Sequence, residues 1–299
     1  MQNNKTHLQN GPLVSVIVPA YNHEKYVVDC LEGIASQSYQ NIQWIVVDDC
    51  SNDKTPQILR ENQTRYGYQL ILHKENKGLS ATLTEAIKDY SKGSFIVICA
   101  SDDVFLPNKI ESQLSFLQEN PQYVMCYSPS IYIDSNSNVI PMKEDIRCYR
   151  SGYIFEEVLC RKFFMGINTM YRSKVFEEVG YYEPGIMAED YYLYSKIAQK
   201  YEIGFLNECS LQYRVVEISK KRDPWKLVLS HKQTLDMYKE DELYSKAVRA
   251  WEVQSAMIIA LTPKYKLIAF KYVIKNFWYF VCHPLDFLRV SKYLVFIWK

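Results

Sequence analysis

Apolar residues in the first hundred positions form short continuous runs separated by stripes at helical spacing. A continuous apolar run of this length is typical of a strand buried on both faces, as in a parallel sheet. Apolar residues at helical spacing predict helices with one buried face. Strands are predicted at 14–19, 43–47, 69–73 and 94–100, with helices between them at 24–36, 56–66 and 79–90. This alternation predicts an α/β fold with a mostly parallel sheet and right-handed crossovers.

The pattern becomes less regular after residue 100. Helices are predicted at 107–120, 173–179 and 190–200, strands at 123–132 and 202–206, and a polar loop at 142–152. The charged segment at 219–223 predicts a boundary, because the chain beyond it is mostly helical. The sequence therefore predicts a flexible lead-in at 1–12, an α/β domain at 13–218 and a helical C-terminal region at 219–299.

Two pairs of adjacent aspartates follow predicted central strands. Asp48-Asp49 comes after the second strand, and Asp102-Asp103 follows the fourth. Ligands of open α/β sheets bind beyond the carboxyl ends of the strands. Two carboxylates about 4 Å apart repel by roughly 4 kcal/mol at an effective dielectric near 20, and a cation or ligand donors usually offset that repulsion. We therefore predict one shared polar site with a divalent metal and a phosphorylated ligand.

Composition narrows the class of protein. The 299 residues are 48% hydrophobic and 23% charged, which is typical of a globular protein, and the formal charge of +1 argues against general nucleic-acid binding. The eight cysteines lack metal-ligand spacing, and the polar N-terminus lacks the order of a signal peptide. We therefore expect reduced thiols in the cytosol.

Several short motifs occur in an order that resembles glycosyltransferase family 2, over roughly residues 13–216. The chain opens with Ser15-Val16-Ile17-Val18-Pro19-Ala20-Tyr21-Asn22. The later elements are Val47-Asp48-Asp49-Cys50-Ser51, Asn76-Lys77-Gly78, Ser101-Asp102-Asp103, Glu189-Asp190-Tyr191 and Tyr213-Arg214. Each motif alone is weak, but their order is specific.

The resemblance implies a GT-A fold, a nucleotide-diphosphate sugar donor and Mg²⁺ or Mn²⁺. Asp49 matches the carboxylate that accepts the imide N–H of the base, which favours UDP or dTDP. Asp102 matches a ribose contact, and Asp103 matches the metal ligand beside the diphosphate. Other donor-binding positions implied by the matched elements are Pro19, Ala20, Tyr21, Lys77 and Arg214. For Arg214, a contact with phosphate and a pairing with a carboxylate at the edge of the core both remain open.

The resemblance also implies a mechanism. Asp190 matches the catalytic base, which would take the proton from an acceptor hydroxyl while that oxygen attacks the sugar. A single displacement of this kind inverts the configuration at the anomeric carbon.

Three positions depart from the family pattern. Ala100 stands where the family often has Asp, Leu83 lies near the place of a common Arg, and Val216 replaces a common His. They leave open a non-catalytic nucleotide-sugar-binding or scaffold subunit. A nucleotidyltransferase is a further alternative, although the first strand lacks a glycine-rich, basic phosphate loop.

The C-terminal segment 264–299 carries a net charge of +6, which leaves −5 on the rest of the chain, and it contains eleven aromatic residues. Its longest uncharged stretch, 276–285, is too short to span a bilayer. We expect two helices separated at Pro284, lying on the anionic cytoplasmic leaflet of a bacterial membrane. The acceptor would then be a lipid-linked glycan of surface polysaccharide. Packing against the catalytic domain, or a homodimer through these helices, is the alternative.

Overall fold

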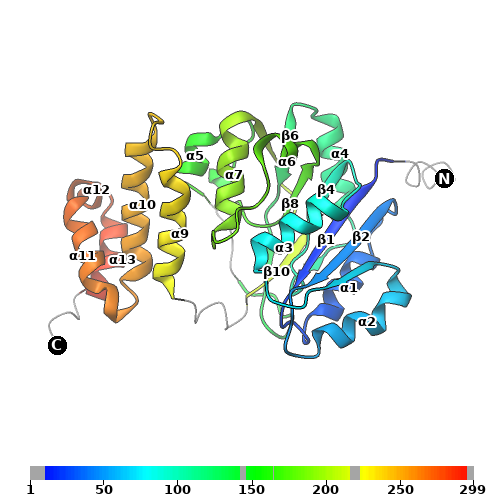
Figure 1. The fold of residues 1–299 in the computed structure, drawn as a ribbon. Helices are drawn as coiled ribbons and strands as arrows, with labels where there is room; N and C mark the ends of the chain where they lie inside the picture. Colours follow the sequence, from blue (N-terminus) through cyan, green and yellow to red (C-terminus); the bar gives the residue numbers. More distant parts are fainter. Residues whose placement is uncertain (1–10, 142–145, 164, 216–222, 295–299) are drawn as a thin grey trace.

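The computed structural model describes residues 11–141, 146–163, 165–215 and 223–294. Most of the predicted lead-in and most of the predicted boundary at 219–223 lie outside these residues. The N-terminal strands and helices alternate as predicted (Figure 1). The strands are β1 (Val14–Ala20), β2 (Ile42–Asp48), β3 (Gln69–Leu72) and β4 (Phe95–Ile98). The connecting helices are α1 (Val27–Ala35), α2 (Thr55–Tyr66) and α3 (Leu79–Glu85), the last continued by a π-helical turn at Ala86–Tyr90.

The main sheet has seven strands in the order β3-β2-β1-β4-β8-β6-β9. Its first four strands are parallel, and β8 (Thr169–Arg172) runs antiparallel to both of its neighbours, β4 and β6 (Tyr123–Tyr127). The edge strand β9 (Glu202–Phe205) is parallel to β6. The predicted α/β class with a mostly parallel sheet is therefore confirmed.

The predicted single strand at 123–132 is wrong. It is divided into β6 and β7 (Ile131–Ile133), and β7 belongs to a second sheet of three strands. Pro129 lies between them and cannot donate a ladder hydrogen bond. The other strands of the small sheet are β5 (Val104–Phe105) and β10 (Leu211–Arg214). Neither of these strands was predicted, nor were β8 and the short helix α5 (Phe155–Leu159).

Both faces of the main sheet are covered by helices. Along β1, Ile17 packs in one core, and its neighbours Val16 and Val18 pack in the other. Successive strand residues point to opposite faces, so two buried faces require the continuous apolar runs seen in the sequence. The remaining helices of this part are α4 (Lys109–Glu119), α6 (Lys174–Val179) and α7 (Glu189–Lys200).

The C-terminal region is helical and lies beyond α7, at the end of the molecule opposite α2 (Figure 1). It consists of α9 (Pro224–Asp236), α10 (Tyr244–Ile259), α11 (Lys266–Lys275), α12 (Phe277–Cys282) and α13 (Pro284–Leu294). Instead of two helices separated at Pro284, the described residues after 264 form three, because Asn276 separates α11 from α12. In the described part of the chain, no helix is both long and apolar enough to span a bilayer.

Candidate functional site

The carboxyl ends of β1, β2 and β4 meet at one edge of the sheet. Ala20 is paired with Asp48, and the N–H of Asp49 donates to the carbonyl of Ala20 at 2.9 Å. On the other side of β1, the N–H of Cys99 donates to the carbonyl of Ile17 at 2.9 Å. The parallel register therefore places the residues after β1, the first aspartate pair and the second aspartate pair side by side.

Asp49 holds the loop that follows β3. Its carboxylate accepts hydrogen bonds from the backbone N–H groups of Lys77 and Gly78, both at 2.8 Å. Its Oδ1 also lies 2.8 Å from Nδ1 of His73. Burial would raise the pKa of Asp49, but the hydrogen bonds from His73 and the two backbone amides outweigh it, and the pKa is lowered. A carboxylate offers about four acceptor positions, so these three donors leave one for a ligand.

The other member of the first pair has a local role. Asp48 accepts from the hydroxyl of Ser51 at 2.6 Å and from its N–H at 3.0 Å. Two nearby residues, Asn22 and Cys50, have φ angles of 56° and 60°. Such left-handed residues cost energy and are often found at functional sites. The N–H of Asn22 also donates to the Ser51 hydroxyl at 2.9 Å, which ties the loop after β1 to the loop after β2.

The second aspartate pair is held by Arg214 at the end of β10. The N–H of Arg214 donates to Oδ1 of Asp103 at 2.8 Å, and its Nε donates to the carbonyl of Asp102 at 2.8 Å. Its Nη1 and Nη2 reach Ser137 and Asp29, at 2.9 and 3.1 Å. The guanidinium is fully buried and packs 4.6 Å from the centre of the Tyr26 ring. These contacts favour the pairing with a carboxylate over a phosphate contact for Arg214.

The two carboxylates of this pair differ in exposure. Asp102 keeps 16% of its side chain exposed and lies 3.7 Å from Nε2 of His23. Asp103 is 1% exposed, and its Oδ2 has no hydrogen-bond partner in the described ranges. Burial and the charge of Asp102 raise the pKa of Asp103 well above its usual range, against the opposing effect of Arg214. An unpartnered buried carboxylate oxygen fits a bound cation, which would satisfy it and lower that pKa.

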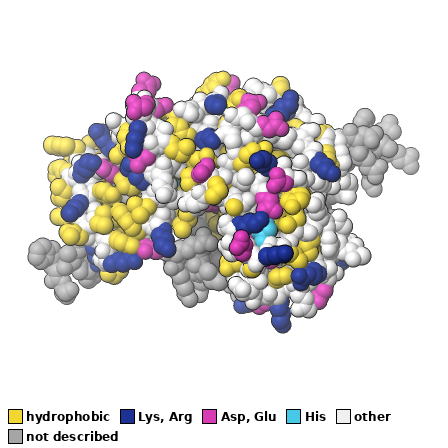
Figure 2. Space-filling view, in the orientation of Figure 1, with side chains coloured by type: hydrophobic (Ala, Val, Ile, Leu, Met, Phe, Trp, Pro, Cys, Tyr) yellow, Lys and Arg dark blue, Asp and Glu magenta, His cyan; other side chains and the backbone are white. Residues whose placement is uncertain are grey.

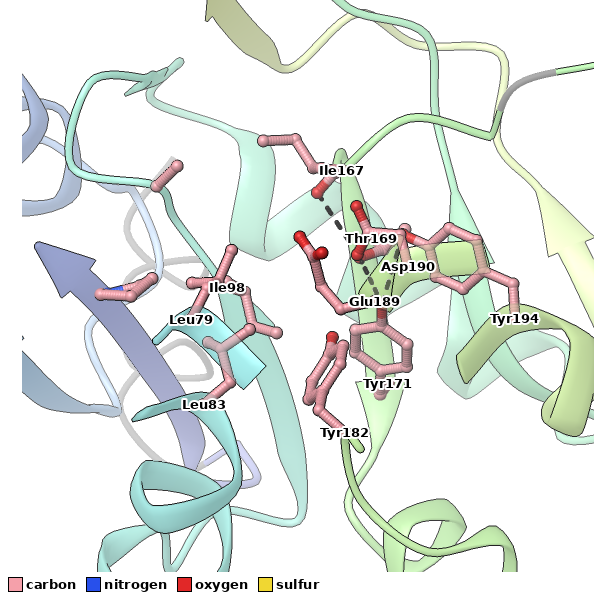
Figure 3. Close-up of a pocket in the computed structure, with 12 residues that line it drawn as sticks. Leu79, Leu83, Ile98, Ile167, Thr169, Tyr171, Tyr182, Glu189, Asp190 and Tyr194 are labelled. Atoms are coloured by element: carbon pink, nitrogen blue, oxygen red, sulfur yellow. Dashed lines mark hydrogen bonds between the residues drawn. The ribbon is translucent and has the colours of Figure 1, made fainter. Parts of the chain in front are cut away.

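Asp190 lines a small cavity at the start of α7 (Figure 3). The cavity has a volume of about 60 Å³, and Pro19 and Ala100 from the sheet edge also line it. No hydrogen bond from the described residues reaches its carboxylate. Burial and the adjacent Glu189 raise the pKa of Asp190 well above its usual range. The predicted base therefore shares one cavity with residues at the ends of β1 and β4.

The cavity wall combines tyrosines with aliphatic side chains. Figure 3 shows Glu189 and Asp190 beside Tyr171, Tyr182 and Tyr194. The hydroxyl of Tyr194 donates to the carbonyl of Gly166 at 2.8 Å, but that of Tyr182 is buried without a partner in the described chain. The aliphatic part of the wall is formed by Leu79, Leu83, Ile98 and Ile167. Leu83 and Ala100, two of the positions that depart from the family pattern, thus line the same cavity as Asp190.

The remaining predicted residues lie near this edge in different roles. Tyr21 is 43% exposed and available to a ligand. Lys77 contributes its backbone N–H to Asp49, whereas its side chain pairs with Glu85 at 2.6 Å. His73 was not among the predicted site residues, but its side chain is 3% exposed and holds Asp49. The position of His73 at the end of the predicted third strand could have indicated that it lies at the sheet edge.

Sequence reasoning also missed Ser230 of α9. Its hydroxyl accepts from the N–H of Met187 at 2.8 Å and from that of Ala188 at 2.9 Å. These amides directly precede Glu189 and Asp190, so the C-terminal region holds the segment that carries the predicted base.

The fold is that of a GT-A glycosyltransferase, and comparisons with known proteins agree. The sequence model described as "Glycosyl transferase family 2" matches residues 15–180, more than half of the chain. The chain belongs to this family and is a glycosyltransferase.

Similar proteins include an uncharacterized glycosyltransferase of Methanocaldococcus jannaschii. It is 29% identical over 68% of this chain and 71% of its own length. Glycosyltransferase GlyG of Streptococcus pneumoniae is 38% identical over 42% of each chain, so this chain spans less than two thirds of that relative.

Two solved structures share the fold. Residues 1–349 of TarS from S. aureus, in complex with UDP-GlcNAc, align with a TM-score of 0.64 at 18% identity, over 87% of this chain and 80% of that one. The mannosyltransferase PcManGT from Pyrobaculum calidifontis, in complex with GDP-Man and Mn²⁺, aligns with a TM-score of 0.54 at 17% identity, over 91% and 88%.

Proposed function

We propose that this glycosyltransferase moves a sugar from a nucleotide-diphosphate sugar to a glycan hydroxyl with inversion, and that Asp190 is the base. The observation that carries the proposal is the environment of Asp190. Its carboxylate lines a cavity, has no hydrogen-bond donor within the described ranges and has a raised pKa. Burial next to another carboxylate raises the pKa of Asp190, and a raised pKa makes a carboxylate a stronger base.

The donor nucleotide would lie at the carboxyl ends of β1 and β2. Pro19, Ala20 and Tyr21 would border the base and ribose, and Asp49 would accept an imide N–H at its remaining acceptor position. This favours UDP or dTDP, and the nucleotide sugar in the TarS complex is consistent with it. Lys77 would contribute through its backbone, because its side chain is paired with Glu85.

The diphosphate would lie beside Asp102 and Asp103. The unpartnered Oδ2 of Asp103 is the atom best suited to hold Mg²⁺ or Mn²⁺, and Asp102, the more exposed of the two, would contact the ribose. No group of three or more metal-ligating side chains occurs in the described ranges. Mg²⁺ commonly uses one or two carboxylates together with substrate phosphates. When bound, such a cation neutralises charge on the departing diphosphate.

In the transfer, the acceptor oxygen forms a bond to the anomeric carbon while the bond from that carbon to the diphosphate breaks. The proton of the acceptor hydroxyl passes to Asp190. The aliphatic side chains around the cavity limit the access of water, which keeps the pKa of Asp190 raised.

The test is an Asp190→Asn variant, with Glu183→Gln, a change at an exposed carboxylate of the same segment, as its control. We expect Asp190→Asn to bind the donor normally and to lose transfer by roughly a hundredfold or more, the usual contribution of a general base. Calorimetry with UDP-sugars measures binding, and donor hydrolysis with Mn²⁺ measures turnover with water as the acceptor. The assignment is wrong if Asp190→Asn turns over normally or if Glu183→Gln loses the rate to the same extent. Donor binding by the wild-type protein without turnover would instead identify a binding or scaffold subunit.

We further propose a lipid-linked glycan as the acceptor, in the assembly of a bacterial surface polysaccharide at the cytoplasmic face of the membrane. Support for this setting comes from the surface of the C-terminal helices.

A further inference from the structure

Helices α11, α12 and α13 expose a continuous set of large apolar side chains. We define the C-terminal apolar face by its most exposed members, Leu267, Ile274, Trp278, Val281, Leu285 and Leu288. Trp278 is 76% exposed and Leu285 is 70% exposed. Figure 2 shows hydrophobic side chains gathered over this end of the molecule, with Lys and Arg among them. Exposed apolar clusters of this kind usually mark an interaction site.

The packing of the helices does not account for this face. A different side of each helix is buried in the hydrophobic core that also contains α9 and α10, through residues such as Val273, Phe280 and Val290. Residues 267, 270 and 274 of α11 are spaced three and four apart, so they form a separate stripe that faces solvent. The three helices are therefore apolar on two sides, and only the inner side stabilises the fold.

Positive charge surrounds the exposed stripe. Lys271 and Lys292 are exposed and make no ion pair with any described residue. Lys275 and Arg289 are exposed as well, although they pair with Glu252 and Asp286. The segment as a whole carries +6, whereas the rest of the chain carries −5. The partner of this face should therefore be both apolar and anionic.

We propose that the C-terminal apolar face docks on an anionic lipid surface. The aromatic and aliphatic side chains would enter the boundary between headgroups and acyl chains, and the lysines would extend toward the phosphates. This inference deepens the proposed function, on which its biological purpose rests, because it would bring the enzyme to a lipid-linked acceptor.

A homodimer is the other occupant to consider, and the charge argues against it. A two-fold interface brings the same patch of both subunits together. Lys271 and Lys292 of both subunits would then be gathered in one interface, and like charges across an interface are unfavourable. An anionic lipid surface instead presents negative charge to all of these basic side chains.

The experiment is flotation of the full-length protein with vesicles of phosphatidylcholine alone or with 30% phosphatidylglycerol, a composition chosen as roughly that of a moderately anionic membrane. The apolar variant is Trp278→Gln/Leu285→Gln/Leu288→Gln. Its control is Val139→Gln/Tyr153→Gln, which changes two residues that are 67% and 74% exposed on the α/β domain. The charge variant is Lys271→Glu/Lys292→Glu.

We expect the wild type and the control to bind anionic vesicles. The apolar variant should partition to these vesicles at least about tenfold less than the wild type. The charge variant should lose its preference for anionic over neutral vesicles. The proposal is overturned if wild type does not float, if the apolar variant floats like wild type, or if light scattering shows a dimer that the apolar variant dissociates. Nucleotide binding in solution is measured in parallel. If the wild-type protein does not bind nucleotide, the proposed function is refuted, whereas the result on membrane docking is unaffected.

Discussion

Asp49 shows how one carboxylate can organise a binding site. Its two oxygens gather His73 and the amides of Lys77 and Gly78, so the loop after β3 takes its shape from a charge at the end of β2. These hydrogen bonds lower the pKa of Asp49, which means that the folded state favours the ionised form of its carboxyl group.

This predicts how stability depends on pH. A group with a lowered pKa in the folded state stabilises the protein above its unfolded pKa, near 3.9 for Asp, and loses that contribution as the pH falls below it. We therefore expect Asp49→Asn to lower the free energy of unfolding by about 1–3 kcal/mol at pH 7. The difference from wild type should shrink as the pH falls from 5 toward 3. Urea unfolding at several pH values measures it, and a constant difference would contradict the assignment.

A second prediction at this scale concerns Asp103. Asp103→Asn keeps the size of the side chain and its acceptor for the Arg214 N–H, but it removes the charge that a divalent cation needs. We expect the loss of Mn²⁺-dependent donor hydrolysis. In the absence of metal the melting temperature should not fall below that of wild type, because the raised pKa of Asp103 shows that its charge does not stabilise the metal-free fold. Titration with Mn²⁺ after EDTA treatment is the measurement, and near-normal activity would show that another residue holds the metal.

At the level of elements, the link between α9 and α7 connects the C-terminal region to the proposed base. Ser230 supplies one oxygen to two backbone amides that precede α7, a role similar to that of a helix cap. Because Ser230 is buried, its loss would leave both amides without a partner in a place that water does not reach easily.

We predict that Ser230→Ala lowers the free energy of unfolding by about 0.5–2 kcal/mol and lowers kcat more than it raises KM for the donor. Ser255→Ala is the matched control, because Ser255 of α10 is equally buried and its hydroxyl has no partner in the described structure. Thermal melts and steady-state kinetics distinguish the two variants. Equal effects of both changes would show that Ser230 does not position the segment before Asp190.

Local patterns predicted the parallel half of the sheet because each strand there is buried on both faces and reads as a continuous apolar run. They predicted Asp49, Asp103 and Asp190 as candidates, since strand ends and a motif order can be read along the chain. They missed β8 and Ser230, whose roles depend on partners far away in sequence. Ser230 meets its partners 42 and 43 positions away, and no periodicity reports such a pairing.

On the scale of the whole molecule, charge and hydrophobicity are divided between the two ends. The acidic sheet edge lies in the part of the chain that carries −5, and the C-terminal apolar face lies in the part that carries +6. The sequence predicted this division and the helical character of the region. It could not show that the aromatic residues serve both an inner core and an outer surface, because that depends on which side of each helix meets α10.

The position of β8 in the sheet has a consequence for synthesis of the chain. This strand lies between β4 and β6 but is complete only at residue 172, whereas β4 ends at residue 98. At a typical 5–20 residues per second, the ribosome needs roughly 4–15 s to make the intervening segment. During that time the open edge of β4 presents unpaired backbone groups, the usual template for aggregation. The nascent chain is therefore most exposed to misassembly in the interval before β8 is made and can pair with β4.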